Sequence, residues 1–243
     1  MPQRDRLREK ITSIIRAKSM EITMLKVAVF DSGWGGDIVA QDIEDNLAIV
    51  EVIRIIDWRN APYADKSRYT IRRLVETALK PYIGQVDVIV MASFEAQCAM
   101  RYLKTRFPYQ KFIQMDWPCK DVLANNPRTM MILAGDRAKH SFEYRLWRRQ
   151  FKKQRIIEPP CEHWTARIDE NGISREFLRR ELAPYKKKKI DTVVLGNTHF
   201  WDLKEQIEDI LGWRTMVVDP RQILIDQLNT VLKLEGTSYL KSW

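Results

Sequence analysis

Short apolar runs recur along the chain from residue 26 onward, and polar or charged residues border each of them. Runs of this length that are rich in Val, Ile and Met are typical of strands buried on both faces. The runs are 26–30, 51–57, 86–92, 111–115, 129–134, 191–196 and 214–219. They predict the strands of parallel sheets.

Stretches with helical spacing of apolar residues lie between these runs. They are 68–82, 96–106, 141–153, 175–185 and 203–211. Alternation of strands and helices over the whole chain predicts an α/β fold with helices on both faces of each sheet. Ligands of such folds bind beyond the carboxyl ends of the strands. A site is therefore expected just after residues 30, 57, 92, 134 and 196.

Residues 1–23 predict an appended basic helix, because Leu7, Ile11, Ile14 and Ile15 form an apolar stripe among basic residues. One interpretation is that the stripe packs on the body of the protein or on a second copy in a homodimer. Another is an arm that binds nucleic acid or an anionic membrane surface. A third is that Met20 or Met24 is the true start.

The composition is that of a globular protein, with 45% hydrophobic and 30% charged residues. No apolar run approaches the roughly 20 residues of a membrane-spanning helix, and no secretory signal is recognisable, so we expect a cytoplasmic protein without a membrane span. The formal net charge of +9 favours a polyanionic partner such as nucleic acid or an acidic protein.

The cysteines and histidines do not predict a metal centre. Cys98, Cys119 and Cys161 are scattered without paired spacing, which is typical of reduced thiols in a cytoplasm. The three histidines form no metal-ligand pattern with them. We therefore expect no metal cofactor.

Polar and glycine-rich segments follow several predicted strands. They are 31–36 (DSGWGG), 57–67 (DWRNAPYADKS), 93–96 (SFEA) and 195–200 (LGNTHF). Glycines after a strand let backbone N–H groups approach an anion such as a carboxylate, although a tight strand-to-helix turn alone explains them equally well. A lone histidine is more often structural, but His199 follows a buried strand beside polar residues, which favours a pocket role.

In this order and spacing, these segments resemble the glutamate racemases of the aspartate/glutamate racemase superfamily. That family has DSGxGG, PYGxKS, ACNTAS and GCTHF segments, and a final strand that leads to an Asp-Pro pair, here Asp219-Pro220. The resemblance covers roughly residues 25–230.

The resemblance implies two α/β domains related by a pseudo-twofold axis, with an amino-acid site in the cleft between them. The first domain would comprise 24–115 plus 220–243, and the second 116–219. Family members racemise glutamate without a cofactor and supply D-glutamate for peptidoglycan. One cysteine removes the α-proton and a second, on the opposite face, returns one.

Carried over position by position, the resemblance places Ser93 and Asn197 where the family has its two cysteines. Phe94 and Glu95 replace the Asn and Thr that follow the first cysteine, and Ala64 replaces the glycine of PYGxKS. The retained candidate catalytic residues are Asp31 and His199. The candidate substrate-binding residues are Ser32, Pro62, Tyr63, Phe94, Glu95 and Thr198.

These replacements remove both bases of the family's reaction. A thiol with a pKa of about 8.5 can be poised as a thiolate near neutral pH. A serine hydroxyl stays protonated without a strong base, and an asparagine amide does not titrate in the useful range. None of the three cysteines is a convincing substitute. Glu95 is either a new catalytic carboxylate with a pKa raised by burial or a solvent-facing residue at a helix start, and we favour the second.

Basic residues also concentrate in two stretches of the predicted second domain. The first contains Arg137, Lys139, Arg145, Arg148, Arg149, Lys152, Lys153 and Arg155; the second contains Arg179, Arg180 and Lys186–Lys189. Tyr144, Trp147 and Phe151 interleave the first stretch, as in surfaces that bind a phosphate backbone and stack on bases. The alternative places Leu146, Phe151 and Trp147 in the core and leaves the arginines solvated.

Three functions remain open. The first, which we favour, is a homologue that does not racemise amino acids and has a binding or regulatory role. The second is an enzyme in which Asp31, Glu95 or His199 does acid–base work on an amino acid or a related acid. The third is a protein whose basic surfaces bind nucleic acid or a protein partner.

Overall fold

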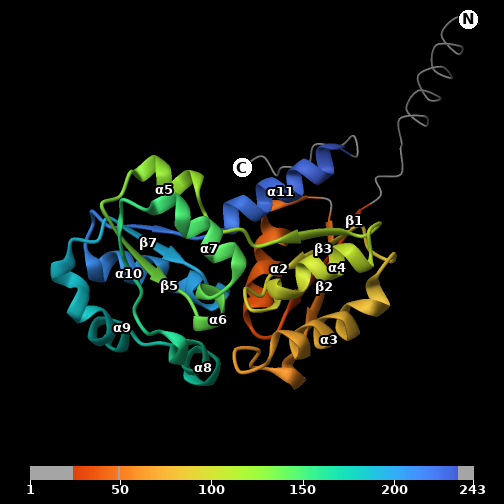
Figure 1. Cartoon of the computed structure of the whole chain (residues 1–243), viewed down its shortest axis with the longest axis horizontal. Coiled ribbons are helices and arrows are strands. Elements are labelled where there is room, and N and C mark those ends of the chain that lie inside the picture. The colour runs from red at the N-terminus through yellow and green to blue at the C-terminus, as the bar shows by residue number, and fades with distance from the viewer. Residues whose placement is uncertain (1–23, 49, 235–243) are drawn as a thin grey trace, which may run out of the picture.

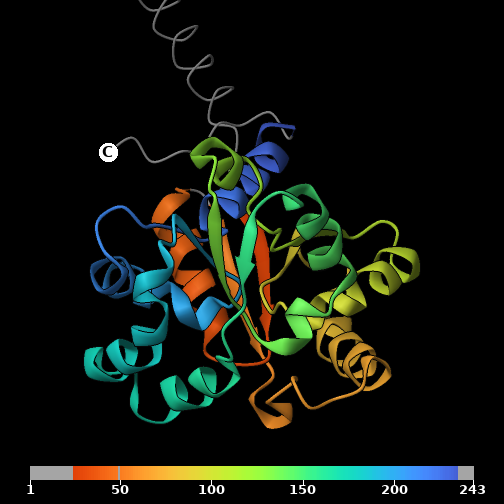
Figure 2. The same cartoon turned by 60° about the vertical axis from the view of Figure 1, so that its left-hand side comes forward.

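The computed structural model describes residues 24–48 and 50–234. Its strands form two four-stranded parallel sheets, which lie inside the molecule with helices outside them (Figures 1 and 2). The strand orders β2-β1-β3-β4 and β6-β5-β7-β8 are the same order repeated, as a pseudo-twofold relation requires. The predicted α/β fold with two parallel sheets is confirmed.

The first sheet consists of β1 (Leu25–Asp31), β2 (Val50–Ile56), β3 (Val88–Met91) and β4 (Lys111–Gln114). Alternate side chains of β1 face opposite sides, as strand geometry requires. Val27 and Val29 pack with helix α2 (Gly35–Asn46), whereas Ala28 and Phe30 pack with α3 (Arg68–Leu79) and α4 (Met100–Arg106). Helix α11 (Arg221–Leu234) packs against α2 and β4, so the end of the described chain returns to the first sheet (Figure 1).

The second sheet consists of β5 (Thr129–Leu133), β6 (Arg155–Ile157), β7 (Thr192–Leu195) and β8 (Met216–Val218). Its helices are α5 (Lys120–Asn125), α6 (Asp136–Lys139), α7 (Phe142–Arg148), α8 (Glu162–Asn171), α9 (Arg175–Leu182) and α10 (Lys204–Leu211). The larger of two apolar clusters contains residues of both sheets, such as Val29 of β1 and Leu195 of β7, together with Phe94 and Trp117 from the connections. The two halves therefore share one continuous core.

Every predicted strand is present, although β6 and the helices α2, α5, α6 and α8 were not predicted. Several predicted helices are partly 3-10, because Ala96–Ala99 (η3) precedes α4, Arg149–Phe151 (η4) ends α7 and Ala183–Lys188 (η5) ends α9. The basic helix predicted for residues 1–23 lies outside the described residues. The division of the chain at residues 115 and 219 stays a prediction. Among the described helices, none has the length and apolar character that crossing a membrane demands.

Candidate functional site

The carboxyl edges of the two sheets meet at the turns that follow β1 and β7. A Cβ atom built on Gly35 would lie 1.8 Å from Thr198 Oγ1, and one built on Gly33 would lie 3.6 Å from His199 Nε2. The turn after β3 meets the turn after β5 in the same way, because a Cβ on Gly135 would lie 3.2 Å from Glu95 Oε1. Glycine is needed at position 35 for this close approach of the two turns.

We call the residues at this contact the inter-sheet site. It contains Asp31, Ser93, Phe94, Glu95, Asn197, Thr198 and His199. All of them except Glu95 are less than a tenth exposed. Three of the four polar segments predicted from the sequence, 31–36, 93–96 and 195–200, contribute residues to this site. The fourth segment, 57–67, does not.

Asp31 is the most perturbed group of the inter-sheet site. Its Oδ1 accepts hydrogen bonds from the backbone N–H groups of Ser32 (2.6 Å) and Gly33 (3.2 Å). Within the described part of the chain, its Oδ2 is buried without a hydrogen-bond partner. Burial raises the pKa of Asp31 to about 7, the charge of His199 opposes this rise, and Glu95 adds to it. The carboxyl group can therefore hold or release a proton near neutral pH.

Ser93 is built into the start of the 3-10 helix η3. Its Oγ accepts a hydrogen bond from the backbone N–H of Ala96 at 3.3 Å and donates to Glu95 Oε2 at 3.4 Å. The side chain is 2% exposed. Glu95 is partly buried between Ser93 and Gly135, and the structure gives it no pairing with Lys66, whose Nζ donates to the Pro62 carbonyl oxygen instead.

Asn197 caps the 3-10 helix η6 (Thr198–Leu203). Its Oδ1 accepts a hydrogen bond from the backbone N–H of His199 at 3.0 Å, and its Nδ2 donates to Thr165 Oγ1 at 3.1 Å. The same Oδ1 lies 3.1 Å from His199 Nδ1. Because an amide oxygen only accepts, this contact places a proton on Nδ1 of His199. Asn197 thus orients the histidine.

An aromatic wall closes one side of the inter-sheet site. The ring of Phe94 lies 5.2 Å from that of Trp117, which in turn lies 4.8 Å from Tyr144 and 5.4 Å from Trp147. A Cβ on Gly196 would lie 2.3 Å from Trp117 Cη2, so this glycine admits the indole ring beside the end of β7. The site is consequently apolar on one side and ionisable on the other.

The predicted binding residues of the 57–67 segment have other partners. The Tyr63 hydroxyl donates to Asp57 Oδ2 at 2.6 Å, and its ring is 1% exposed beside Phe30. Pro62 is exposed after a cis peptide bond, and Ser32 is half-buried. Burial and the hydrogen bond to Asp57 raise the pKa of Tyr63, and the charge of Asp31 adds to the rise. These residues border the inter-sheet site, and the structure describes no contact of theirs with Ser93 or Asn197.

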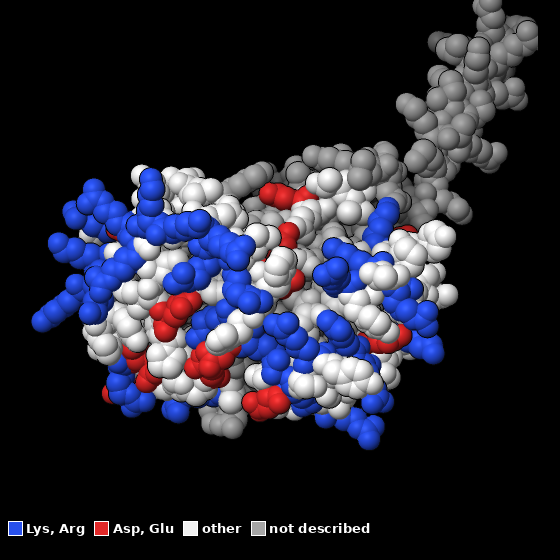
Figure 3. Space-filling model, viewed as in Figure 1, with Lys and Arg blue, Asp and Glu red and all other residues white. Residues whose placement is uncertain are grey.

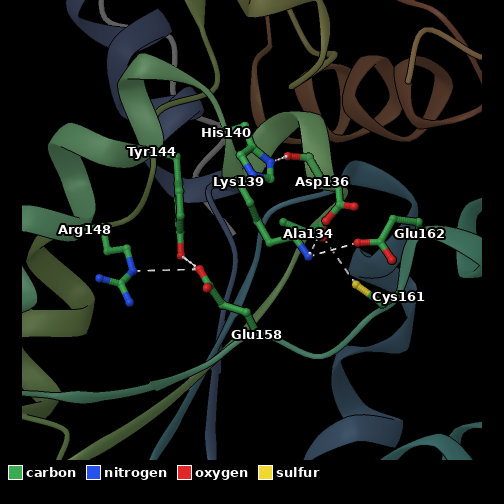
Figure 4. Close-up of polar contacts among 9 residues, drawn as sticks. All are labelled: Ala134, Asp136, Lys139, His140, Tyr144, Arg148, Glu158, Cys161 and Glu162. Atoms are coloured by element: carbon green, nitrogen blue, oxygen red, sulfur yellow. Dashed lines mark hydrogen bonds and ion pairs between the residues drawn. The ribbon is translucent and has the colours of Figure 1, made fainter. Parts of the chain in front are cut away.

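The three cysteines are free thiols, and burial raises the pKa of each. Cys161 is buried at the end of the second sheet, where its Sγ lies 3.4 Å from the Ala134 carbonyl oxygen (Figure 4). Burial raises its pKa to about 12, so it is a neutral thiol at physiological pH. Burial also raises the pKa values of Cys98 and Cys119, and Cys119 Sγ donates to Gln150 Oε1.

Several contributors to the site had no sequence signal. Trp117, Thr165 and Gly135 reach it only because distant segments fold together. Arg137 also joins the two halves, since its Nε and Nη2 donate to the Ala64 carbonyl oxygen at 3.0 and 2.7 Å. Across residues 24–48 and 50–234, no group of three His, Cys, Asp or Glu side chains could hold a metal ion. The absence of a cofactor stays a prediction.

The chain was compared with known proteins. No model of a protein family matches it. The glutamate racemase of Aliarcobacter butzleri is 29% identical over 225 residues, which cover 87% of this chain and 85% of the relative. The glutamate racemase of Aquifex aeolicus is 26% identical over 224 residues, covering 89% of this chain and 87% of the relative.

Among solved structures, the Escherichia coli glutamate racemase in complex with L-glutamate and the activator UDP-MurNAc-Ala superposes with a TM-score of 0.74. It is 24% identical, and the alignment covers 90% of this chain and 86% of that one. The relatives match close to nine tenths of the chain in sequence, and the solved structure has the same fold. The chain is therefore a glutamate racemase homologue within the aspartate/glutamate racemase superfamily.

Proposed function

We propose that this protein binds a small amino-acid-like ligand in a binding or regulatory role and does not racemise amino acids through paired thiols. The observation that carries the proposal is the state of Ser93 and Asn197, the predicted positions of the two family cysteines. Both side chains are buried and engaged in hydrogen bonds that cap the segments after β3 and β7. They serve local structure and offer no proton for exchange at a carbon atom.

Proton chemistry supports the same proposal. Two-base racemisation needs one group on each face of the α-carbon with a pKa near the working pH. The hydroxyl of Ser93 donates to the carboxylate of Glu95 at 3.4 Å, and the structure describes no imidazole or amine beside it that could act as its base. The amide of Asn197 cannot titrate. A face without a titratable group leaves the reaction without a donor or an acceptor.

The charges of the inter-sheet site indicate the ligand's chemistry. Asp31 and Glu95 contribute two carboxyl groups, and the aromatic wall of Phe94 and Trp117 contributes apolar surface. Such a site favours an ammonium group beside the carboxyl groups and disfavours a second carboxylate on the ligand. We therefore propose an amino acid without an acidic side chain, in contrast to the glutamate bound by the Escherichia coli relative.

Calorimetric titration of the protein with neutral and acidic amino acids tests the ligand. Saturable binding of a neutral amino acid that is lost in Asp31→Asn supports the proposal, and tighter binding of glutamate contradicts it. Circular dichroism of L-glutamate and L-aspartate incubated with the protein tests the chemistry. The signal is expected to persist, and its decay to zero contradicts the proposal.

A second function, an enzyme that uses carboxyl and imidazole groups, is favoured by one specific observation. Burial raises the pKa of Asp31 to about 7, and the charge of His199 opposes that rise, so a carboxyl group that titrates near neutral pH interacts with an imidazole group. Turnover of an amino acid or a 2-substituted acid that is lost in His199→Ala and inflects near the Asp31 pKa would support it. No turnover across such a panel counts against it.

The third prediction, a partner for the basic surfaces, does not involve the inter-sheet site and depends on different residues.

A further inference from the structure

Basic side chains gather on the face shown in Figure 3, over α7 and over the region between α6 and α3. Some of them already have partners. Lys139 Nζ lies 2.9 Å from Glu162 Oε1 and 3.0 Å from Asp136 Oδ1, and Arg148 Nε lies 3.9 Å from Glu158 Oε1 (Figure 4). Arg145 and Arg149 are exposed, and the structure describes no ion pair for either. Their charge is available to a partner.

The aromatic residues that were predicted to interleave this basic stretch are in the core. Tyr144, Trp147 and Phe151 are 2%, 4% and 1% exposed, and they pack in a row that ends on Trp117. They cannot stack on bases, so that interpretation is wrong, and the alternative that places Phe151 and Trp147 in the core is confirmed for these two residues. Leu146, which was assigned to the core, is 53% exposed, because it lies on the outer side of α7.

Two other aromatic side chains, from different halves of the molecule, are exposed. Tyr69 in the first turn of α3 is 70% exposed, and Phe142 at the start of α7 is 63% exposed. Arg68 Nη2 lies 3.4 Å from the His140 carbonyl oxygen, so the start of α3 adjoins the corner between α6 and α7. Tyr69 and Phe142 follow these residues by one and two positions, so their backbone positions lie close to the two sides of the same junction.

Three arginines converge at this junction. Arg68 and Arg72 are one helical turn apart on α3, and Arg137 comes from α6 in the other half. All three lie close enough to the partly buried thiol of Cys98 to affect its pKa. Burial raises this pKa, and the charges of the three arginines oppose the rise. Glu143 is the carboxylate in this group, but no described ion pair joins it to any of the three. We call Arg68, Tyr69, Arg72, Phe142, Arg145 and Arg149 the junction surface.

We propose that the junction surface binds single-stranded nucleic acid, with phosphates on its arginines and bases stacked on Tyr69 and Phe142. A basic surface that carries exposed aromatic rings is the arrangement that binds single strands without reading their sequence. Salt bridges to phosphates release counterions, so binding is expected to weaken steeply as salt rises. The net charge of +9 supports the encounter with a polyanion.

Fluorescence anisotropy with a labelled oligothymidylate of about 15 nucleotides tests this proposal. Tyr69→Ala and Phe142→Ala are each expected to weaken binding by roughly tenfold, because stacking on one base is lost. Tyr109→Ala is the matched control: Tyr109 is fully exposed, but it precedes β4 at the amino edge of the first sheet. It is expected to bind like the wild type.

Charge-reversal variants distinguish direct contacts with phosphates from an effect of the net charge of the protein. In Arg72→Glu/Arg145→Glu, the slope of log affinity against log salt is expected to become less negative by roughly 1.4, about 0.7 for each lost phosphate contact. Lys187→Glu/Lys188→Glu changes the net charge equally in η5, which packs against α9 and α10. Its slope is expected to stay near the wild-type value.

Three results would each overturn the proposal. The first is no binding of the oligonucleotide at low salt. The second is equal binding of inorganic polyphosphate together with no effect of Tyr69→Ala and Phe142→Ala, which would mean charge attraction alone. The third is tighter binding of duplex than of single strands of the same length. None of these results bears on the inter-sheet site, so this test is independent of the proposed function.

Discussion

The inter-sheet site and the junction surface lie in the same molecule but are built in opposite ways. The first consists of buried side chains whose hydrogen bonds and ring contacts leave little room for change, and burial raises the pKa of Asp31 there to about 7. The second consists of exposed arginines and rings with few described partners. Substitutions in the first are therefore expected to alter stability, and substitutions in the second to alter binding alone.

The largest expected effect is that of Trp117→Ala. Trp117 is 6% exposed and contacts Phe94, Tyr144 and Trp147, so its loss leaves a cavity and should lower the free energy of unfolding by about 3–5 kcal/mol. Urea denaturation measures the change. Trp213→Ala is the control, because Trp213 is 86% exposed and its loss should cost less than about 0.5 kcal/mol. Similar losses in both variants would contradict the contrast between buried and exposed regions.

Asp31→Asn should change how stability depends on pH. The folded state holds a proton on Asp31 up to about pH 7, whereas the unfolded state releases it near 3.8. The folded state therefore binds more protons between these values, and this group makes stability fall as pH rises, by on the order of 4 kcal/mol. Asparagine keeps the acceptor for Ser32 and Gly33 but cannot ionise.

Denaturation of the wild type and Asp31→Asn across this pH range measures the difference. The variant should gain stability over the wild type as pH rises toward 7 and level off above it. A constant difference at every pH would show that the carboxyl group has an ordinary pKa.

Arg137→Ala should have an intermediate effect. The variant loses two hydrogen bonds from a charged group to the Ala64 carbonyl oxygen, which together contribute about 1–3 kcal/mol. Thermal denaturation should show a lower midpoint than in Arg149→Ala, whose exposed side chain has no described hydrogen bond or ion pair. Equal midpoints would mean that this contact does not hold the two halves together.

The smallest effect is expected for Tyr69→Ala. Its side chain is 70% exposed, so the free energy of unfolding should change by less than about 0.5 kcal/mol even though nucleic-acid binding weakens. The same denaturation experiment measures this. A decrease of several kcal/mol in the free energy of unfolding would show that Tyr69 is packed in the protein and would contradict its place on the junction surface.

Much of the fold could be predicted because the inner strands β3, β5 and β7 are buried at every position and are mostly apolar. The run at 129–134 became β5, which is buried at every position. The edge strand β6 was missed because Arg155–Ile157 is short and begins with an exposed arginine after a basic stretch. Helix α2 was not predicted because it begins inside the glycine-rich segment 31–36, which is typical of a turn. Val39, Ala40 and Ile43 nevertheless have helical spacing and face the core.

The inter-sheet site could be predicted only in part. Asp31 and His199 follow apolar strands in recognisable segments, so local sequence indicated that both lie at strand ends. Trp117 and Thr165 could not be found, since their roles depend on contacts with residues far away in the sequence. The exposure of Leu146 and the burial of Trp147 show the same limit, because the phase of a short helix depends on what it packs against.

Exchange of the α-proton of bound amino acids for solvent deuterium tests the central claim most directly. The protein is incubated with L-glutamate, L-aspartate and neutral amino acids in deuterium oxide, and the loss of the α-proton signal is followed by nuclear magnetic resonance. We predict no loss above that of a protein-free sample, because Ser93 and Asn197 neither remove nor return a proton. Exchange that is catalysed by the wild type and abolished in Ser93→Ala/Asn197→Ala would contradict the account.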